Sequence, residues 1–202
     1  MTDNPNTPMK IIVEIASAHE GSYNNMLKLI DLSIKTGADA LKFQILNQES
    51  HITSSHKIYD LVGQLEFSSD QWLNIMSYTR SKTDMIIMTD VYDIASISTV
   101  KLMDPDMVKI HSADLNNKQL VKMVARLSKD TMIGIGTSSL EEIRKAIQWF
   151  KEENAENRLT LMHGFQGFPT KLEDMNMSHI KTYKELFGLQ VGFLDHTEGE
   201  TE

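Results

Sequence analysis

The sequence contains no cysteine, only four prolines and no apolar run long enough to cross a bilayer. Without thiols, the chain can form neither a disulfide nor a thiolate metal site. A transmembrane helix needs about 20 consecutive apolar residues, so we expect no membrane span and no membrane partner. Residues 1–8 are polar, which predicts no signal peptide and a cytoplasmic protein.

Basic residues are fewer than acidic ones. The 202 residues carry 20 Lys and Arg against 28 Asp and Glu, which gives a net charge of −8. Nucleic-acid binding requires a basic face, so this charge argues against a nucleic-acid partner. A small anionic substrate remains compatible with it, because a few lysines make a local positive pocket. With 41% hydrophobic residues, the chain should fold around a substantial core.

Short runs rich in apolar and β-branched residues alternate with amphipathic stretches along the chain. Alternation at spacings of about 25 to 30 residues is typical of parallel βαβ units. Helix signals lie between the runs: Ser22 precedes a predicted helix, Ser138 with Glu141 predicts a capping box, and Gly188 ends a helix. The predicted strands are Ile11–Ala16, Ala40–Ile45, Met85–Thr89, Met107–Ile110, Met132–Ile135, Leu159–His163 and Gln190–Leu194.

The connection from Leu46 to Ser68 is longer than the others. It is polar at first and becomes amphipathic over Lys57–Leu65. A long excursion after a strand is typical of active-site lids, but surface insertions are tolerated in the same place. Both interpretations stay open on the sequence.

Several side chains suited to binding or catalysis lie at or near the ends of the apolar runs. His163 and His196 each close a run, and Glu14, Lys42 and Lys109 end or lie late in three others. A barrel of parallel strands brings these ends to one face, so we expect the five side chains to share one site. Two imidazoles suit a divalent metal, and two lysines suit an anion. The pattern favours a metal-assisted enzyme that handles an anionic substrate.

Most of these side chains also have a purely structural interpretation. A histidine near a strand end is more often a hydrogen-bonded structural residue than a ligand. A strand-end lysine can lay its aliphatic stem on apolar surface and keep its charge in water. Glu14 is harder to explain in this way, because burying a carboxylate without a partner is costly.

Six short segments occur in a fixed order. They read EIASAHEG at 14–21, GADALKFQ at 37–44, KIHSAD at 109–114, LMH at 161–163, FPT at 168–170 and LDHTEG at 194–199. Together they resemble the motifs of the sialic acid (N-acetylneuraminate) synthase family, which includes legionaminic and pseudaminic acid synthases. The resemblance runs from about Lys10 to Gly199 and is specific because the six segments keep their order and intervals.

This resemblance implies a TIM-type (β/α)8 barrel, and seven predicted strands imply a barrel truncated after the seventh. We expect 1–202 to be a single incomplete barrel domain that lacks the family's C-terminal antifreeze-like domain, and the full-length form to be a homodimer. The implied transferase reaction condenses phosphoenolpyruvate with an N-acyl hexosamine to give a nonulosonic acid and phosphate. The sequence does not identify the amino sugar.

The resemblance also assigns roles to individual residues. His163 and His196 would hold a divalent metal, Mn or else Mg or Co, which polarises the aldehyde of the open-chain sugar. Glu14 would act as an acid/base or water-orienting group, while Lys42 and Lys109 would bind the anionic groups of phosphoenolpyruvate. The matched substrate-binding positions are Gln44, Thr89, Ser112 and Asp114, with Asp90 as the alternative to Thr89 because the match is ambiguous by one residue there.

Two departures from the family pattern are visible. Ala18 replaces an amide that would help to orient substrate, and Gly134 lies where the fifth strand end normally offers a phosphate-binding hydroxyl. Two other functions therefore stay open. One is a Schiff-base aldolase that uses Lys42 or Lys109 as its nucleophile. The other is a degenerate barrel that binds a sugar or a partner without catalysis.

Overall fold

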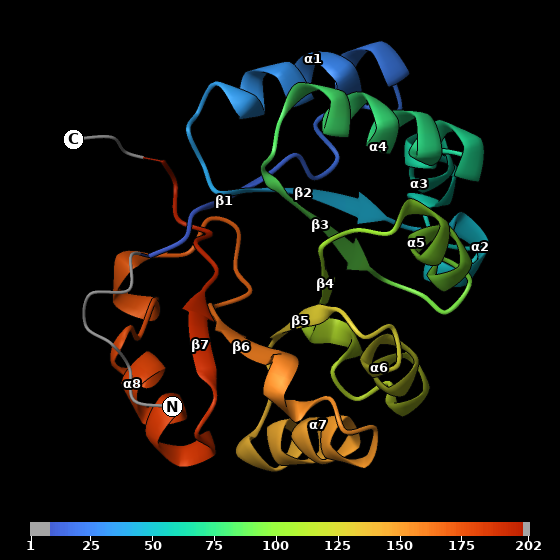
Figure 1. Cartoon of the computed structure of the whole chain (residues 1–202). Helices are drawn as coiled ribbons and strands as arrows, with labels where there is room; N and C mark the ends of the chain where they lie inside the picture. The colour runs from blue at the N-terminus through green and yellow to red at the C-terminus, as the bar shows by residue number, and fades with distance from the viewer. Residues whose placement is uncertain (1–8, 200–202) are drawn as a thin grey trace.

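The computed structural model describes residues 9–199, which form one parallel sheet curled into a half-barrel with helices outside it (Figure 1). The polar segment 1–8 lies outside the described residues. The strand order follows the sequence from β1 to β7, and each strand pairs in parallel with the next. All seven predicted strands are present, with ends within two residues of the predicted ones. They are β1 Ile12–Glu14, β2 Ala40–Ile45, β3 Ile86–Val91, β4 Met107–Ile110, β5 Asp130–Gly134, β6 Leu159–His163 and β7 Gln190–Phe193.

Helices fill the connections between strands. The α-helices are α1 Tyr23–Ile34, α2 Gln48–His51, α3 Tyr59–Leu65, α4 Ser69–Lys82, α5 Ile97–Met103, α6 Lys118–Ala125, α7 Leu140–Glu152 and α8 Ser178–Phe187. Short 3-10 helices span Ser112–Asp114, Glu156–Arg158 and Leu172–Asp174. Within 9–199, no helix combines the length and apolar character that a bilayer-spanning segment requires.

Strand side chains alternate between two faces of the sheet. Successive residues of a strand point to opposite sides, so Leu41, Phe43 and Ile45 of β2 lie on the outer face and join the core beneath the helices. The ring of Phe43 packs edge-on against Trp72 of α4, with centroids 5.9 Å apart. The residues between them face the concave inner side, and this alternation decides which polar groups reach the site.

The predicted helix boundaries are confirmed at two positions and shifted at a third. The Ser22 hydroxyl accepts the Asn25 N–H at the start of α1, and Gly188 ends α8 with a φ of +67°. The capping box of α7 uses Ser139 and Glu142, so the predicted pair lies one residue too early. The reason is local: Ser138 donates its N–H to the Ile135 carbonyl in the turn after β5, which leaves the next residue extended and free to cap.

The long connection after β2 folds back onto its own start. Near its end lies Glu66, whose carboxylate accepts the Asn47 side-chain N–H at 3.0 Å and the Gln48 backbone N–H at 2.8 Å. Helices α2 and α3 lie within this closed excursion. One residue of α2, His51, packs edge-on against Tyr92 just after β3, with ring centroids 5.2 Å apart. The excursion therefore contacts the end of the sheet at which β3 terminates.

Candidate functional site

Four charged side chains from adjacent strands meet on the inner face. Glu14 of β1 is in register with Lys42 of β2, and Asp90 of β3 is in register with Lys109 of β4. Because all four occupy inward positions of parallel strands, the register itself brings them together. We call Glu14, Lys42, Asp90 and Lys109 the lysine–carboxylate cluster.

Short ion pairs connect the cluster. The Lys42 Nζ lies 2.9 Å from Glu14 Oε2 and 3.2 Å from Asp90 Oδ2, and the Lys109 Nζ lies 2.9 Å from the same Asp90 oxygen. The Gln44 amide donates to Glu14 Oε1 at 2.6 Å. The two lysine side chains are 4% exposed and that of Asp90 is 1% exposed, whereas that of Glu14 is 34% exposed. The cluster is thus buried at its centre and open at Glu14.

Burial and neighbouring charges act on the two lysines with different results. For Lys42, burial alone would lower the pKa, but the carboxylates of Asp90 and Glu14 outweigh it and raise the pKa above its ordinary value. For Lys109, burial lowers the pKa, the Asp90 carboxylate opposes this, and the positive charge of Lys42 adds to the lowering. Lys109 is therefore the more readily deprotonated amine of the two.

A cavity of about 180 Å³ opens over the cluster. Six of the predicted site residues line it, and so does Asp90, the alternative to Thr89; the six are Glu14, Lys42, Gln44, Lys109, Ser112 and His196. Side chains from β1, β2, β4 and the segments after β4 and β7 thus share one pocket, as expected for strand ends of a barrel. Gly134 packs closely against Ser112 of the lining, because a Cβ there would lie 2.9 Å from the Ser112 backbone nitrogen.

The sequence analysis assigned no role to two further lining residues, Tyr92 and His111. Their rings lie beside each other, with centroids 5.3 Å apart. Burial raises the pKa of Tyr92, and the neighbouring carboxylates reinforce this. Burial also lowers the pKa of His111, with the charge of Lys109 adding to the effect, so the imidazole is neutral near pH 7. Tyr92 follows the inward-facing Asp90 by two positions, and His111 follows the inward-facing Lys109 by two positions. Because alternate residues of a strand share a face, this spacing was the sequence signal that could have placed both rings in the site.

Two predicted substrate-binding residues lie away from the cavity. Thr89 is fully buried on the outer face, between Ile87 and Val91 of the core. Thr89 therefore does not line the cavity, and strand alternation turns Asp90, the alternative at this position, inward instead. Asp114 belongs to the 3-10 helix after β4 and is absent from the cavity lining. Burial raises the pKa of its carboxyl group.

The two predicted metal ligands lie on different faces of the sheet. His196 lines the cavity, where its Nδ1 contacts the Phe165 carbonyl at 2.8 Å and its ring lies 4.2 Å from that of Phe168. His163 is buried on the outer face, and its ring packs against His179 and Tyr183 of α8. A shared site for His163 and His196 is thus not formed, and the cause is again strand alternation: His163 follows the core residue Leu161 by two positions.

The residues present do not fit the implied divalent metal. Each histidine donates one ring N–H to a carbonyl, His163 through Nε2 to Met175 at 2.9 Å and His196 through Nδ1 to Phe165 at 2.8 Å, which leaves one nitrogen on each ring for a metal. These two nitrogens do not converge, because the His163 ring packs against α8 and His196 lines the cavity. Within residues 9–199, no three His, Asp or Glu side chains are gathered as a metal site.

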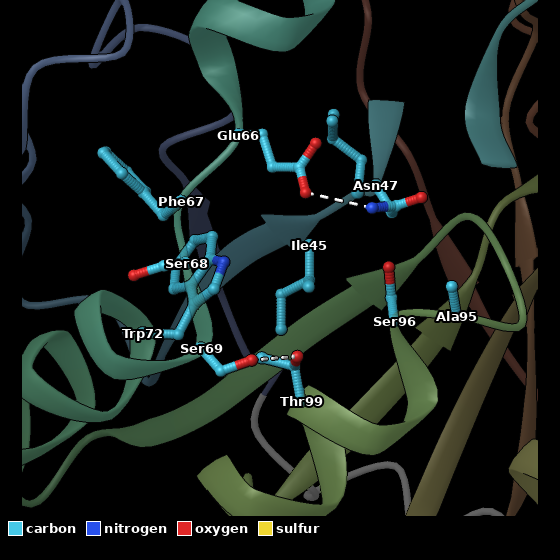
Figure 2. Close-up of a pocket in the computed structure, with 11 residues that line it drawn as sticks. Ile45, Asn47, Glu66, Phe67, Ser68, Ser69, Trp72, Ala95, Ser96 and Thr99 are labelled. Carbon is cyan, nitrogen blue, oxygen red and sulfur yellow. Dashed lines mark hydrogen bonds between the residues drawn. The ribbon is translucent and has the colours of Figure 1, made fainter. Parts of the chain in front are cut away.

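A second cavity of about 260 Å³ lies beside the first part of the long connection (Figure 2). Ile45 on its wall is an outer-face residue, so this cavity is on the helix side of the sheet. Its polar side chains pair with one another: Ser69 with Thr99 at 2.9 Å, and Asn47 with Glu66 at 3.0 Å. The first pair joins α4 to α5, and the second joins the two ends of the long connection, which indicates a structural role.

The fold and site define a class of protein: a parallel α/β half-barrel with a buried lysine–carboxylate cluster at the carboxyl ends of its strands. The NeuB family model matches residues 29–201, and the chain belongs to the NeuB family. Pseudaminic acid synthase of Campylobacter jejuni is 30% identical over 212 residues, covering 97% of this chain and 61% of that protein. An uncharacterised protein of Methanocaldococcus jannaschii is 32% identical over 192 residues, covering 95% of this chain and 56% of that protein.

Solved structures support the same relationship. The N-acetylneuraminic acid synthetase of Leptospira borgpetersenii superposes with a TM-score of 0.89 at 28% identity, over 96% of this chain and 67% of that one. A DAHP synthase of Thermotoga maritima shares the fold, with a TM-score of 0.71 at 11% identity. The chain spans 56% to 61% of the length of the two curated relatives described above.

Proposed function

We propose that this chain carries the phosphoenolpyruvate-binding half of a synthase that condenses phosphoenolpyruvate with an N-acyl amino sugar. In that reaction, C3 of phosphoenolpyruvate attacks the sugar aldehyde, water adds to C2, and phosphate leaves. Membership of the NeuB family supports this reaction class. The observation that carries the proposal is the pair of buried lysines on one pocket wall, because Lys42 and Lys109 provide two cationic contacts for a ligand with two anionic groups.

Each lining residue has a role that its position supports. Lys109 lies in β4, and Ser112 begins the 3-10 helix that follows this strand. These two side chains would bind the phosphate, while Lys42 would bind the carboxylate. Glu14 is the more exposed carboxylate of the cluster and is held by Gln44, so it would manage the proton or orient the water that adds to C2. No step is assigned to a metal, because the two histidines do not converge.

One observation favours a second reaction class. Lys109 is buried and its pKa is lowered, which are the conditions that turn a lysine into a nucleophilic amine. A Schiff-base aldolase would attack a carbonyl substrate with this Nζ and release water. Such an enzyme keeps its activity in the presence of a chelator, and borohydride traps its substrate covalently on the lysine.

A phosphate-release assay tests the proposed function. Phosphoenolpyruvate is supplied with a panel of N-acyl hexosamines, with and without manganese, and free phosphate is measured. Release that requires both substrates supports a synthase. Borohydride trapping of a carbonyl substrate on Lys109, without phosphate release, would instead support the aldolase. Failure of phosphoenolpyruvate to bind at all in calorimetry would support a non-catalytic barrel.

A further inference from the structure

Asp90 links the two lysines that are expected to bind the substrate's anionic groups. Its Oδ2 lies 2.9 Å from the Lys109 Nζ and 3.2 Å from the Lys42 Nζ, at the buried centre of the cluster. With two lysines and two carboxylates, the cluster has a formal charge of zero. An incoming dianion therefore meets ammonium groups that are already neutralised, rather than a positive pocket.

The second oxygen of the same carboxylate has no partner. Asp90 Oδ1 is buried, and no donor among the described residues contacts it. A buried acceptor without a donor is unfavourable, so the arrangement holds this carboxylate through one oxygen only. Such a carboxylate is easier to displace from an ammonium group than one that is bonded through both oxygens. The geometry therefore describes a contact that can open.

We propose that Asp90 is a built-in anion that competes with phosphate-bearing ligands for Lys109 and Lys42, and so sets how strongly the site takes up a dianion. The inference rests on the proposed function, since it takes these two lysines as the binders of the substrate's anionic groups. When the phosphate contacts Lys109, the Asp90 carboxylate gives up its 2.9 Å contact.

Asp90→Asn removes the competing charge and keeps the side-chain volume. The cluster then has a net positive charge, and we expect inorganic phosphate and phosphoenolpyruvate to bind about tenfold to a hundredfold more tightly than to the wild type. The measurement is calorimetric titration of the whole chain with each compound, after circular dichroism has shown that the variant is folded. If Asp90→Asn does not fold, Asp90→Ser gives a second neutral side chain for the same titration.

Two matched variants separate competition from a general charge effect. Asp90→Glu keeps the negative charge and should give no gain in affinity. Glu14→Gln removes one charge from the partly exposed edge of the cluster and leaves Lys109 paired, so its gain should stay below about threefold. A neutral Asp90 variant that is folded and binds phosphate no more tightly than the wild type would overturn the proposal.

This outcome is distinct from failure of the proposed function. Tight phosphate binding by Asp90→Asn without phosphate release from any sugar would support the competition and contradict the synthase. Phosphate release by the wild type together with unchanged affinity in the variant would support the synthase and contradict the competition.

Discussion

At the residue scale, one-position shifts along a strand decide which side chains reach the site. Asp90 faces the cavity and Thr89 faces the core, although they are adjacent in the sequence. The sequence predicted that Glu14, Lys42, Lys109, His163 and His196 would converge, and all of these except His163 line one cavity. It could not predict which of two neighbours at the β3 end faces inward, because the extension of β3 to Val91 depends on pairing with β4.

The same alternation accounts for the metal prediction. His163 and His196 each follow an apolar run, and the metal prediction rests on their place at strand ends without regard to the face that each one takes. In the structure, β6 places Leu159, Leu161 and His163 on the same side, against the helices. A histidine that continues the phase of core residues is better interpreted as a packing residue, and the phase of the apolar positions is visible in the sequence itself.

Replacing Lys109 tests the anion-binding role of a single residue. In Lys109→Ala, phosphoenolpyruvate loses one charge-assisted contact, and we expect its KM or Kd to rise about tenfold to a hundredfold. Lys145→Ala is the control, because Lys145 lies on the outer surface of α7 and pairs with Glu141. Steady-state kinetics or calorimetry makes the comparison. An unchanged constant in Lys109→Ala would contradict the assignment.

At the element scale, glycines allow the ends of β5, β6 and β7 to approach closely. A Cβ at Gly136 would overlap the carbonyl oxygen of Gly164, and one at Gly164 would lie 2.5 Å from the Leu194 carbonyl oxygen. Both obstacles are backbone atoms, which cannot turn aside as a flexible side chain would. The sequence shows these glycines but not the strand ends that require them, since that contact joins segments far apart in the chain.

Gly136→Ala should therefore destabilise the fold. The added methyl group forces the ends of β5 and β6 apart, and we expect the free energy of unfolding to fall by about 2 to 4 kcal/mol. Gly199→Ala is the matched control, because a Cβ there meets nothing within 4 Å. Urea unfolding followed by circular dichroism measures both. Equal stability of the two variants would contradict the close approach.

Asp106 connects the ends of two elements and gives a pH-dependent prediction. Its Oδ2 accepts the Ile87 N–H at 2.7 Å and lies 2.8 Å from the Arg80 guanidinium. Burial opposes ionisation of this carboxyl, but these two partners outweigh it and hold its pKa below 3.8. Because the folded pKa lies below the unfolded one, the contact stabilises the fold above about pH 3.8, and this contribution disappears as pH falls through the folded pKa.

Asp106→Asn should lower the free energy of unfolding by about 1 kcal/mol near neutral pH, since the side chain is partly exposed and solvent weakens the ion pair. The difference from the wild type should shrink as the pH is lowered, because protonation removes the same charge from the wild-type residue. Urea titrations at a series of pH values measure it. If the free energy of unfolding of Asp106→Asn stays below that of the wild type by the same amount at acidic pH, the charge of Asp106 does not contribute to stability.

At the scale of the whole molecule, the described sheet is open. The sheet begins at β1 and finishes at β7, and each of these strands pairs on one side only. Such strands offer unpaired backbone groups to another chain. The alternation of apolar runs and helices predicted this α/β architecture and all seven strands. Side-chain details that depend on long-range pairing, such as the inward position of Asp90 at the end of β3, were beyond its reach.

Open edges predict self-association of the chain. Sedimentation velocity should show oligomers whose fraction rises with protein concentration. A lysine on the edge strand, as in Gln190→Lys, should reduce this fraction, because a charged edge opposes strand pairing. Gln148→Lys on the exposed face of α7 supplies the same charge away from the edge and should leave association unchanged. A concentration-independent monomer would refute the prediction.

The buried lysines of the inner face are proposed to bind the substrate's anionic groups, and the other site assignments depend on this claim. A crystal structure of the chain with phosphoenolpyruvate tests it most directly. We expect the phosphate to contact the Lys109 Nζ and the Ser112 hydroxyl, with the carboxylate near Lys42 and the Lys109–Asp90 distance longer than 2.9 Å. Phosphoenolpyruvate bound elsewhere, with the lysine–carboxylate cluster unchanged, would contradict the claim.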